Sequence, residues 1–126
     1  MSGASRKDVE RFLRELKRCE RIFVVDERQD KKNEETLEIL KITPKHREEE
    51  IRALRVKDYY RGPNPDHSNP SENVWEFGKK VRGEEIYIKV KIFKTSSGRK
   101  YGKCLSFHFP DKPITYPFKK REIEDV

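Results

Sequence analysis

The segment from Glu85 to Lys94 constrains the fold more than any other part of the chain, because its side chains alternate strictly in character. One set is aliphatic and consists of Ile86, Ile88, Val90 and Ile92. The other set is polar or aromatic and consists of Tyr87, Lys89, Lys91 and Phe93. A period of two places the two sets on opposite faces of a β-strand. The sequence therefore predicts a sheet with one face in the core and the other at the surface.

Two further strands are predicted beside this segment, residues 74–80 before it and residues 103–109 after it, each joined to it by a glycine-containing turn. In the earlier strand, the aromatic pair Trp75 and Phe77 shares one face. In the later strand, one side is expected to carry Leu105, Phe107 and Phe109, and the other Cys104, Ser106 and His108. Short connections between successive strands indicate an antiparallel sheet.

The amino-terminal part of the chain predicts helices. Ser5 can cap a helix whose apolar side chains recur at helical spacing, namely Val9, Phe12, Leu13 and Leu16. Thr43-Pro44 predicts the start of a second helix that runs to about Arg55. Between these helices, residues 22–25 predict a short buried strand, and residues 37–42 predict a short helix or a turn.

The order of these elements predicts an α+β fold, with amino-terminal helices packed on an antiparallel sheet. A chain of 126 residues fits one domain, 1–126. Residues 1–4 and 119–126 are expected to fray, although the tail at Tyr116-Pro117-Phe118 is expected to pack back on the body. The polar stretch after Pro63, as far as about Asn73, is expected to be a loop.

Basic residues are concentrated in the predicted sheet. The chain has 30 Lys and Arg against 23 Asp and Glu. Residues 1–58 hold 16 basic and 14 acidic residues, whereas residues 79–103 hold nine basic and two acidic residues. A local basic surface attracts polyanions, and nucleic acid is the commonest polyanion in a cytoplasm. From charge alone, a solvated face of a lysine-rich protein is an equal alternative.

Several classes of protein are not indicated. No apolar run approaches the length of a membrane span, and the first residues lack the apolar segment of a secretory signal. Cys19 and Cys104 lack CxxC spacing, so reduced thiols in a cytoplasmic protein are expected. The histidines lie far apart in the sequence: His46, His67 and His108. We therefore expect no metal site, no cofactor and no membrane association.

The polar face of the predicted sheet gathers the groups that metal-free RNA cleavage needs. They are Glu76, Tyr87, Lys89, Lys91, Ser106 and His108. A base must remove the proton of the 2′-hydroxyl, cations must stabilise the charge on phosphorus, and an acid must protonate the leaving 5′-oxygen. Each residue singly has an ordinary structural explanation, since Glu76 and Lys89 could form a simple cross-strand ion pair. The hypothesis depends on their sharing one face, and therefore on the strand register.

Short segments over roughly residues 50–118 resemble the MqsR family of toxins. They are Asp58-Tyr59-Tyr60, Gly62-Pro63, Val74-Trp75-Glu76-Phe77-Gly78-Lys79, Glu85-Ile86-Tyr87-Ile88-Lys89, Leu105-Ser106-Phe107-His108 and Tyr116-Pro117-Phe118. The resemblance implies a RelE-like fold, with helices packed on a curved antiparallel sheet. It also implies an mRNA interferase, a sequence-selective endonuclease of messenger RNA from a type II toxin–antitoxin system, which a cognate antitoxin neutralises.

The same resemblance implies which residues act. Arg61, Tyr87 and Lys89 stand at family positions of like chemistry. Glu76 and His108 depart from the founding member, which has Gln and Lys at those positions. We expect Lys89 and Arg61 to bind the scissile phosphate, and Tyr87 to orient it or donate to one of its oxygens. His108 and Glu76 are the acid–base candidates, and either could be the base.

Flanking phosphates are expected to meet a further set of lysines, Lys79, Lys80, Lys91 and Lys94. Trp75 could stack on a base, although the register places it toward the core. A non-catalytic nucleic-acid-binding module that uses the same basic face is the alternative function.

Overall fold

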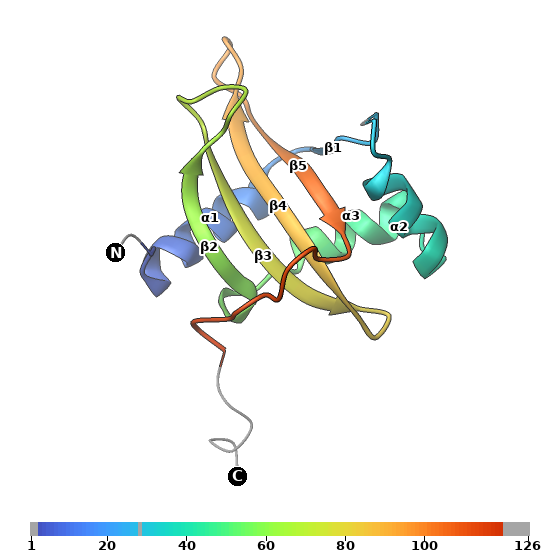
Figure 1. Cartoon of the computed structure of the whole chain (residues 1–126). Coiled ribbons are helices and arrows are strands. Elements are labelled where there is room, and N and C mark those ends of the chain that lie inside the picture. The colour runs from blue at the N-terminus through green and yellow to red at the C-terminus, as the bar shows by residue number, and fades with distance from the viewer. Residues whose placement is uncertain (1–2, 28, 120–126) are drawn as a thin grey trace.

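A computed structural model describes residues 3–27 and 29–119 as an α+β fold (Figure 1). The helices are α1 (Arg6–Arg18), α2 (Lys32–Leu40) and α3 (Pro44–Arg52), followed by the 3₁₀ turn η1 (Val56–Asp58). The strands are β1 (Ile22–Val24), β2 (Tyr59–Pro65), β3 (Asn73–Val81), β4 (Glu84–Lys94) and β5 (Lys100–His108). None of the helices in these ranges has the length and hydropathy that a bilayer span requires.

The five strands form one sheet in the order β1-β5-β4-β3-β2. Strands β2 to β5 are antiparallel to their neighbours, as predicted. Strand β1 is parallel to β5, with Ile22 opposite Gly102, so the expectation of a purely antiparallel sheet is wrong. A parallel pairing is possible because the chain passes through α2, α3 and three other strands before it returns beside β1.

Helices α1 and α3 begin where their capping residues predict. The Ser5 hydroxyl accepts the Asp8 amide, and the Asp8 carboxylate accepts the Ser5 amide, which forms a capping box at α1. The four residues that predicted the apolar stripe of α1 are buried. At α3, the Thr43 hydroxyl accepts the His46 amide at 3.0 Å. Helix α3 ends at Arg52, earlier than expected, and Leu54 is buried in the core.

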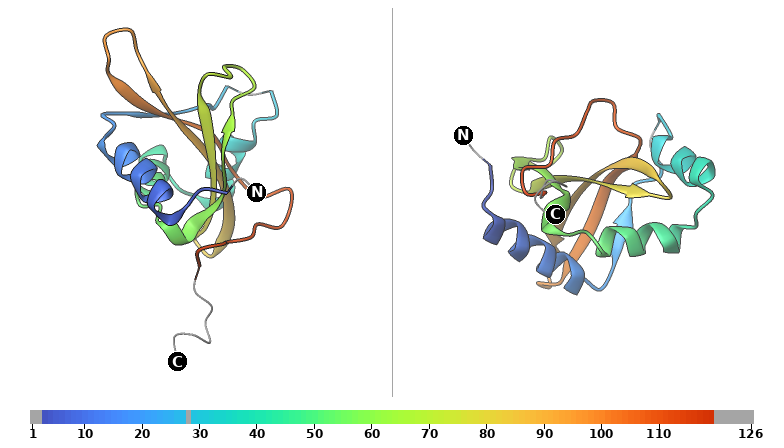
Figure 2. Two further views of the ribbon diagram at one scale, coloured as in Figure 1. Left: turned by 90° about the vertical axis from the view of Figure 1, so that its left-hand side faces the viewer. Right: turned by 90° about the horizontal axis from the view of Figure 1, so that it is seen from below.

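The core lies between one face of the sheet and the helices. Seen edge-on, α1 and α3 cover one side of the sheet, while the segment after β5 crosses the other (Figure 2, left). The aliphatic set of β4 faces the helices: Ile86, Ile88 and Val90 are fully buried, together with Phe77 of β3 and Phe107 of β5. The alternation in β4 therefore predicted the core face correctly.

A bulge in β5 changes one part of the predicted alternation. Lys89 lies opposite Ser106, yet the next residue, Val90, lies opposite Cys104, so Leu105 is the extra residue. The expectation that Cys104 lies beside Ser106 on the polar face of the sheet is wrong. Cys104 is fully buried in the core, where desolvation raises the pKa of its thiol to about 12.

Strand β2 was not predicted, because its pairing with β3 is irregular and leaves no alternation in the sequence. The register shifts on both sides of Arg61. Gly62 adopts a φ of 114°, and a Cβ there would lie 2.9 Å from the carbonyl oxygen of Val74. Only glycine combines this backbone conformation with so close an approach of the two strands.

Asn33 lies in α2 and is buried. Its Nδ2 donates to the carbonyl oxygens of Val25 at 2.7 Å and Leu105 at 3.1 Å. Its Oδ1 accepts the Phe107 amide at 2.9 Å. The Asn33 amide side chain thus forms hydrogen bonds with the β5 backbone that a longer β1 would otherwise form.

The carboxyl-terminal segment, defined as residues 109–119, packs across the sheet, as expected for Tyr116 and Phe118. The Tyr116 hydroxyl donates to the Glu85 carboxylate at 2.6 Å, and the Phe118 ring stacks on Tyr59 at 5.4 Å. Ala4 donates its amide to the Tyr59 hydroxyl at 3.2 Å, so the described residues near both ends make contacts. The expected fraying of residues 1–2 and 120–126 lies outside the described part of the chain.

Candidate active site

The strand register brings the expected site residues together on the outer face, the face of the sheet opposite α1 and α3. Glu76 of β3 lies opposite Lys89 of β4. Lys89 lies opposite Ser106 of β5, and Tyr87 lies opposite His108. Because paired residues project from the same face of a sheet, these five side chains share one surface. The expectation that these residues share one face is confirmed, but the expectation that they face solvent is not, because Glu76, Ser106 and His108 are buried.

Glu76 is the centre of a hydrogen-bond network. The Nε of Arg61 donates to both of its carboxylate oxygens at 3.0 Å. The Tyr87 hydroxyl donates to its Oε1 at 2.6 Å. Only 5% of Glu76 is exposed, so a buried carboxylate is satisfied by a cation and a phenol.

Arg61 reaches from this network into solvent. Its side chain is 58% exposed, and its guanidinium lies 4.8 Å from the centre of the Tyr60 ring. The hydrogen bond to Glu76 raises the pKa of Arg61, so the guanidinium is always charged. A planar cation fixed on one side by a carboxylate and an aromatic ring can hold an anion on its other side.

Tyr87 is a hydrogen-bond donor rather than a base. Burial, and then the hydrogen bond to Glu76, raise the pKa of its phenol well above the usual value of 10. The hydroxyl therefore keeps its proton at physiological pH. Its ring centre lies 5.6 Å from that of His108, with the two planes tilted by 43°.

His108 presents one ring nitrogen as an acceptor. Its Nδ1 lies 2.8 Å from the carbonyl oxygen of Phe109. A carbonyl oxygen can only accept, so Nδ1 carries the proton and the neutral ring leaves Nε2 with a free lone pair. Only 6% of His108 is exposed, which limits its contact with bulk water. The orientation suits a general base.

Two hollows meet beside these groups. The smaller, of about 240 Å³, is lined by His108, Tyr87 and Lys89, and by Lys32 and Lys112. The larger, of about 600 Å³, lies on the β2 side and shares Arg61, Tyr87 and Lys89 with the first. Sequence reasoning missed Lys32 and Lys112, because α2 and the carboxyl-terminal segment bring them to the site from distant parts of the chain.

Tyr60 lines both hollows and was also missed as a site residue. A signal for it was present in the sequence. Tyr59 and Tyr60 form an aromatic pair directly before Arg61. In the structure the first ring is buried in the core and the second supports the guanidinium.

Lys91, expected to bind phosphate, is buried in an ion-pair cluster. Its ammonium contacts the carboxylate of Asp66 very closely and that of Glu72 at 2.6 Å. Both acids belong to the connection between β2 and β3, so the cluster fixes this loop to β4. With its charge neutralised, Lys91 is not placed to meet RNA, and we do not retain it as a contact.

The other expected phosphate-binding lysines lie on different faces. Lys79 projects toward the helices, where its ammonium lies 2.8 Å from the Glu50 carboxylate. Lys94 lines a hollow on the helix side of the sheet. Lys80 is exposed, and the period of two in β3 places it on the outer face, as it places Glu76. Of this set, the geometry therefore retains Lys80 alone.

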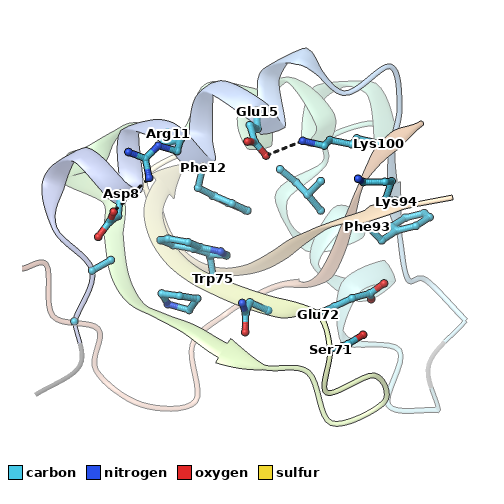
Figure 3. A pocket seen from close by; sticks show the side chains of 15 residues that line it. Asp8, Arg11, Phe12, Glu15, Ser71, Glu72, Trp75, Phe93, Lys94 and Lys100 are labelled. Carbon is cyan, nitrogen blue, oxygen red and sulfur yellow. Dashed lines mark ion pairs between the residues drawn. The ribbon is translucent and has the colours of Figure 1, made fainter. Parts of the chain in front are cut away.

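The hollow on the helix side, of about 700 Å³, carries no acid–base constellation (Figure 3). Its floor is the Trp75 ring, which stacks on Phe12 at 4.6 Å, as the core placement of Trp75 predicted. At its rim, Asp8 pairs with Arg11 at 3.7 Å, and Glu15 pairs with Lys100 at 3.7 Å. We assign the chemistry to the outer face instead.

Comparisons with protein-family models, with curated proteins and with solved structures find no match. Within residues 3–27 and 29–119, no three His, Cys, Asp or Glu side chains gather as metal ligands would. The candidate active site consists of the network around Glu76, of His108 and of the cations beside them.

Proposed function

We propose that this chain is a metal-independent endoribonuclease, an mRNA interferase of the MqsR type with a curved, RelE-like form of the α+β fold. The observation that carries the proposal is the outer-face cluster. There the hydrogen-bonded group of Arg61, Glu76 and Tyr87 lies beside an oriented His108 and the ammonium-bearing Lys89. Metal-free cleavage of RNA needs a base and fixed cations, and candidates for both are present here.

His108 is the proposed base. Its Nε2 takes the proton of the 2′-hydroxyl, and the 2′-oxygen forms a bond to the adjacent phosphorus. The bond from phosphorus to the 5′-oxygen then breaks, and that oxygen takes a proton from a water molecule. The hydroxide that is left takes the proton held by His108, which restores the neutral imidazole. The products are a 2′,3′-cyclic phosphate and a free 5′-hydroxyl. Because Nδ1 donates to the Phe109 carbonyl, the imidazolium that forms is stabilised without moving the ring.

Lys89 and Arg61 stabilise the phosphorane, because the two cations offset the added negative charge on the phosphoryl oxygens. The one hydroxyl proton of Tyr87 is donated to Glu76, so Tyr87 helps to orient this network. Glu76 is a positioning residue in this proposal rather than the base. Its two oxygens accept three hydrogen bonds from Arg61 and Tyr87, which hold both donors in place.

The test is cleavage of a single-stranded RNA in excess EDTA, with the products identified by mass. The wild-type protein is expected to give 2′,3′-cyclic phosphate ends. His108→Ala is expected to lose about 10²- to 10⁴-fold in rate, the usual contribution of a positioned base. The matched control is His46→Ala, since His46 lies on α3 and pairs with Glu50. It removes a histidine far from the outer face and should leave the rate unchanged.

Two results would contradict this mechanism. One is activity that EDTA abolishes and a divalent cation restores. The other is His108→Ala cleaving as fast as the wild-type protein. If the wild-type protein binds RNA with the salt dependence of phosphate contacts but never cleaves it, the non-catalytic binding module is the better description.

The proposed partners are messenger RNA and a cognate antitoxin. The antitoxin follows from the resemblance to the MqsR family, in which such a protein blocks the toxin. Expression of the chain alone should arrest growth, and His108→Ala should relieve the arrest without lowering the amount of folded protein.

A further inference from the structure

Three aromatic side chains gather on the outer face at the end of the sheet away from His108. Phe23 comes from β1, Phe93 from β4 and Tyr101 from β5. Their ring centres lie 5.8 Å apart for Tyr101 with each phenylalanine, and 6.4 Å apart for Phe23 with Phe93. We call these three residues the aromatic platform. Phe93 and Tyr101 are direct partners in the β4–β5 register, and Phe93 also lines the edge of the hollow on the helix side.

The platform faces solvent. Phe23 is 42% exposed, which is unusual for a phenylalanine in a strand, and both other rings are half-buried. The helices that cover the sheet lie on its opposite side (Figure 2). The carboxyl-terminal segment crosses the outer face near Gly78 and Glu85, at the other end. Three neighbouring aromatic rings are thus exposed, in whole or in part, on a surface that is otherwise densely charged.

The platform and the candidate active site lie on the same strands. From Tyr87 to Phe93 is six residues along β4, or about 20 Å at the usual rise of a strand. Between them, Lys89 and Lys103 project from the same face. Exposed aromatic rings, two lysines and the candidate active site therefore follow one another along the β4–β5 hairpin.

We propose that the aromatic platform is a binding site for the bases of single-stranded RNA whose scissile phosphate lies at His108. This inference rests on the proposed ribonuclease function and extends its substrate beyond the scissile nucleotide. Rings open on a sheet surface bind unpaired bases by stacking, and this binding tolerates any base because every base has a π face. The intervening lysines match the phosphates of such a strand.

RNA fits this surface better than a protein partner does. Lys89 and Lys103 project from the outer face between the platform and His108, whereas Lys91 between them is neutralised by Asp66 and Glu72. The guanidinium of Arg99 lies 3.4 Å from the Tyr101 hydroxyl and pairs with Glu20 at 3.5 Å. Apolar rings in line with two lysines suit a ligand that has both flat π faces and phosphates.

The experiment compares two lengths of 2′-O-methyl RNA, which lacks the attacking hydroxyl and cannot be cleaved. An oligonucleotide of about four residues covers the active site alone, whereas one of about ten also reaches the platform. Dissociation constants are measured by fluorescence anisotropy. The variants are Phe23→Leu and Phe93→Leu, which keep an apolar side chain but remove the ring, and Phe23→Trp, which keeps a ring.

Each leucine variant should weaken binding of the longer RNA about fivefold or more and leave the shorter RNA unaffected. Phe23→Trp should bind as the wild-type protein does. The matched control is Ile39→Ala, because Ile39 is an exposed apolar residue on α2, away from the platform. It should change neither constant.

Three results would overturn the inference. The leucine variants could bind the longer RNA normally, or they could lose affinity for both lengths equally, as a damaged fold would. A protein interface would instead show as self-association of the wild-type chain in sedimentation, lost in Phe23→Leu while RNA affinity stays constant. If the wild-type protein cleaves RNA but the leucine variants do not weaken binding of the longer RNA selectively, the proposed role of the platform is wrong. The ribonuclease proposal is then unaffected.

Discussion

At the scale of single residues, the polar side chain with the greatest structural consequence is Asn33. It is almost fully buried, and its amide bonds three backbone groups, at Val25, Leu105 and Phe107. These groups lie where β1 ends and β5 would otherwise expose an edge next to α2. Unpaired buried backbone groups are costly, so one residue compensates for a strand that is too short.

Asn33→Asp is expected to lower the free energy of unfolding by about 1–3 kcal/mol. A carboxylate of the same shape can still accept the Phe107 amide, but it cannot donate to the carbonyls of Val25 and Leu105. Urea denaturation followed by circular dichroism measures the change. Asn64→Asp, at an exposed position of β2, is the control and should stay within about 0.5 kcal/mol. Equal stability of the two variants would contradict this role of Asn33.

At the scale of elements, the carboxyl-terminal segment depends on a glycine in β3. A Cβ at Gly78 would lie 2.6 Å from the Tyr116 hydroxyl and 2.7 Å from Cδ1 of Ile114. Gly78 follows Glu76 by two residues in β3, so the two residues lie on the same outer face. Because glycine has no side chain, the carboxyl-terminal segment can pack directly on the strand there. The segment also supplies Lys112 to the smaller hollow of the active site.

Gly78→Ala is expected to displace the carboxyl-terminal segment and to cost about 1–3 kcal/mol through overpacking. Proteolysis should then cut the chain between residues 109 and 119 more readily. Adding Tyr116→Ala should recover part of the lost stability, because the clashing hydroxyl is gone. Gly3→Ala is the control, since nothing lies within 4 Å of a Cβ there. Additive effects of Gly78→Ala and Tyr116→Ala would contradict the proposed clash.

At the scale of the whole molecule, ion pairs hold segments that are distant in sequence. Lys91 joins β4 to the connection between β2 and β3 through Asp66 and Glu72. The hydrogen bond from Lys91 lowers the pKa of Asp66 below its ordinary value of 3.8, although burial opposes this shift. The folded state therefore binds this proton less readily than the unfolded state does, which makes stability depend on pH.

The sign of this dependence follows from the lowered pKa. The stabilisation by Asp66 is complete above 3.8 and is lost as the pH falls through the lower, folded-state pKa. Asp66→Asn is expected to cost roughly 1–3 kcal/mol at neutral pH, because Glu72 still pairs with Lys91. Below pH 4, its stability should fall less steeply than that of the wild-type protein.

Urea denaturation at a series of pH values measures how steeply the free energy of unfolding falls with pH in the variant and in the wild-type protein. Asp111→Asn is the control, because it removes an exposed carboxylate that pairs with Lys32 at the surface. It reports the effect of losing one negative charge by itself. Parallel curves for Asp66→Asn and the wild-type protein in the acid range would show that Asp66 does not carry this dependence.

The sequence by itself determined the features that depend on local periodicity. The alternation in β4 identified the core face and the outer face, and the stripe and caps of α1 fixed that helix. The same period placed Glu76, Tyr87, Lys89 and His108 on one surface. A period of two or 3.6 is imposed by the geometry of the backbone within one element, so it can be recognised without knowing the partners of that element.

Only the tertiary structure decided the features that depend on partners far away in the chain. The bulge at Leu105 moved Cys104 into the core, and the irregular pairing of β2 left no pattern in its sequence. Lys79 and Lys91 look like free cations in the sequence, but Glu50 and Asp66 neutralise them in the fold. Whether a charge is paired depends on which segments pack together, and a one-dimensional pattern does not contain that information.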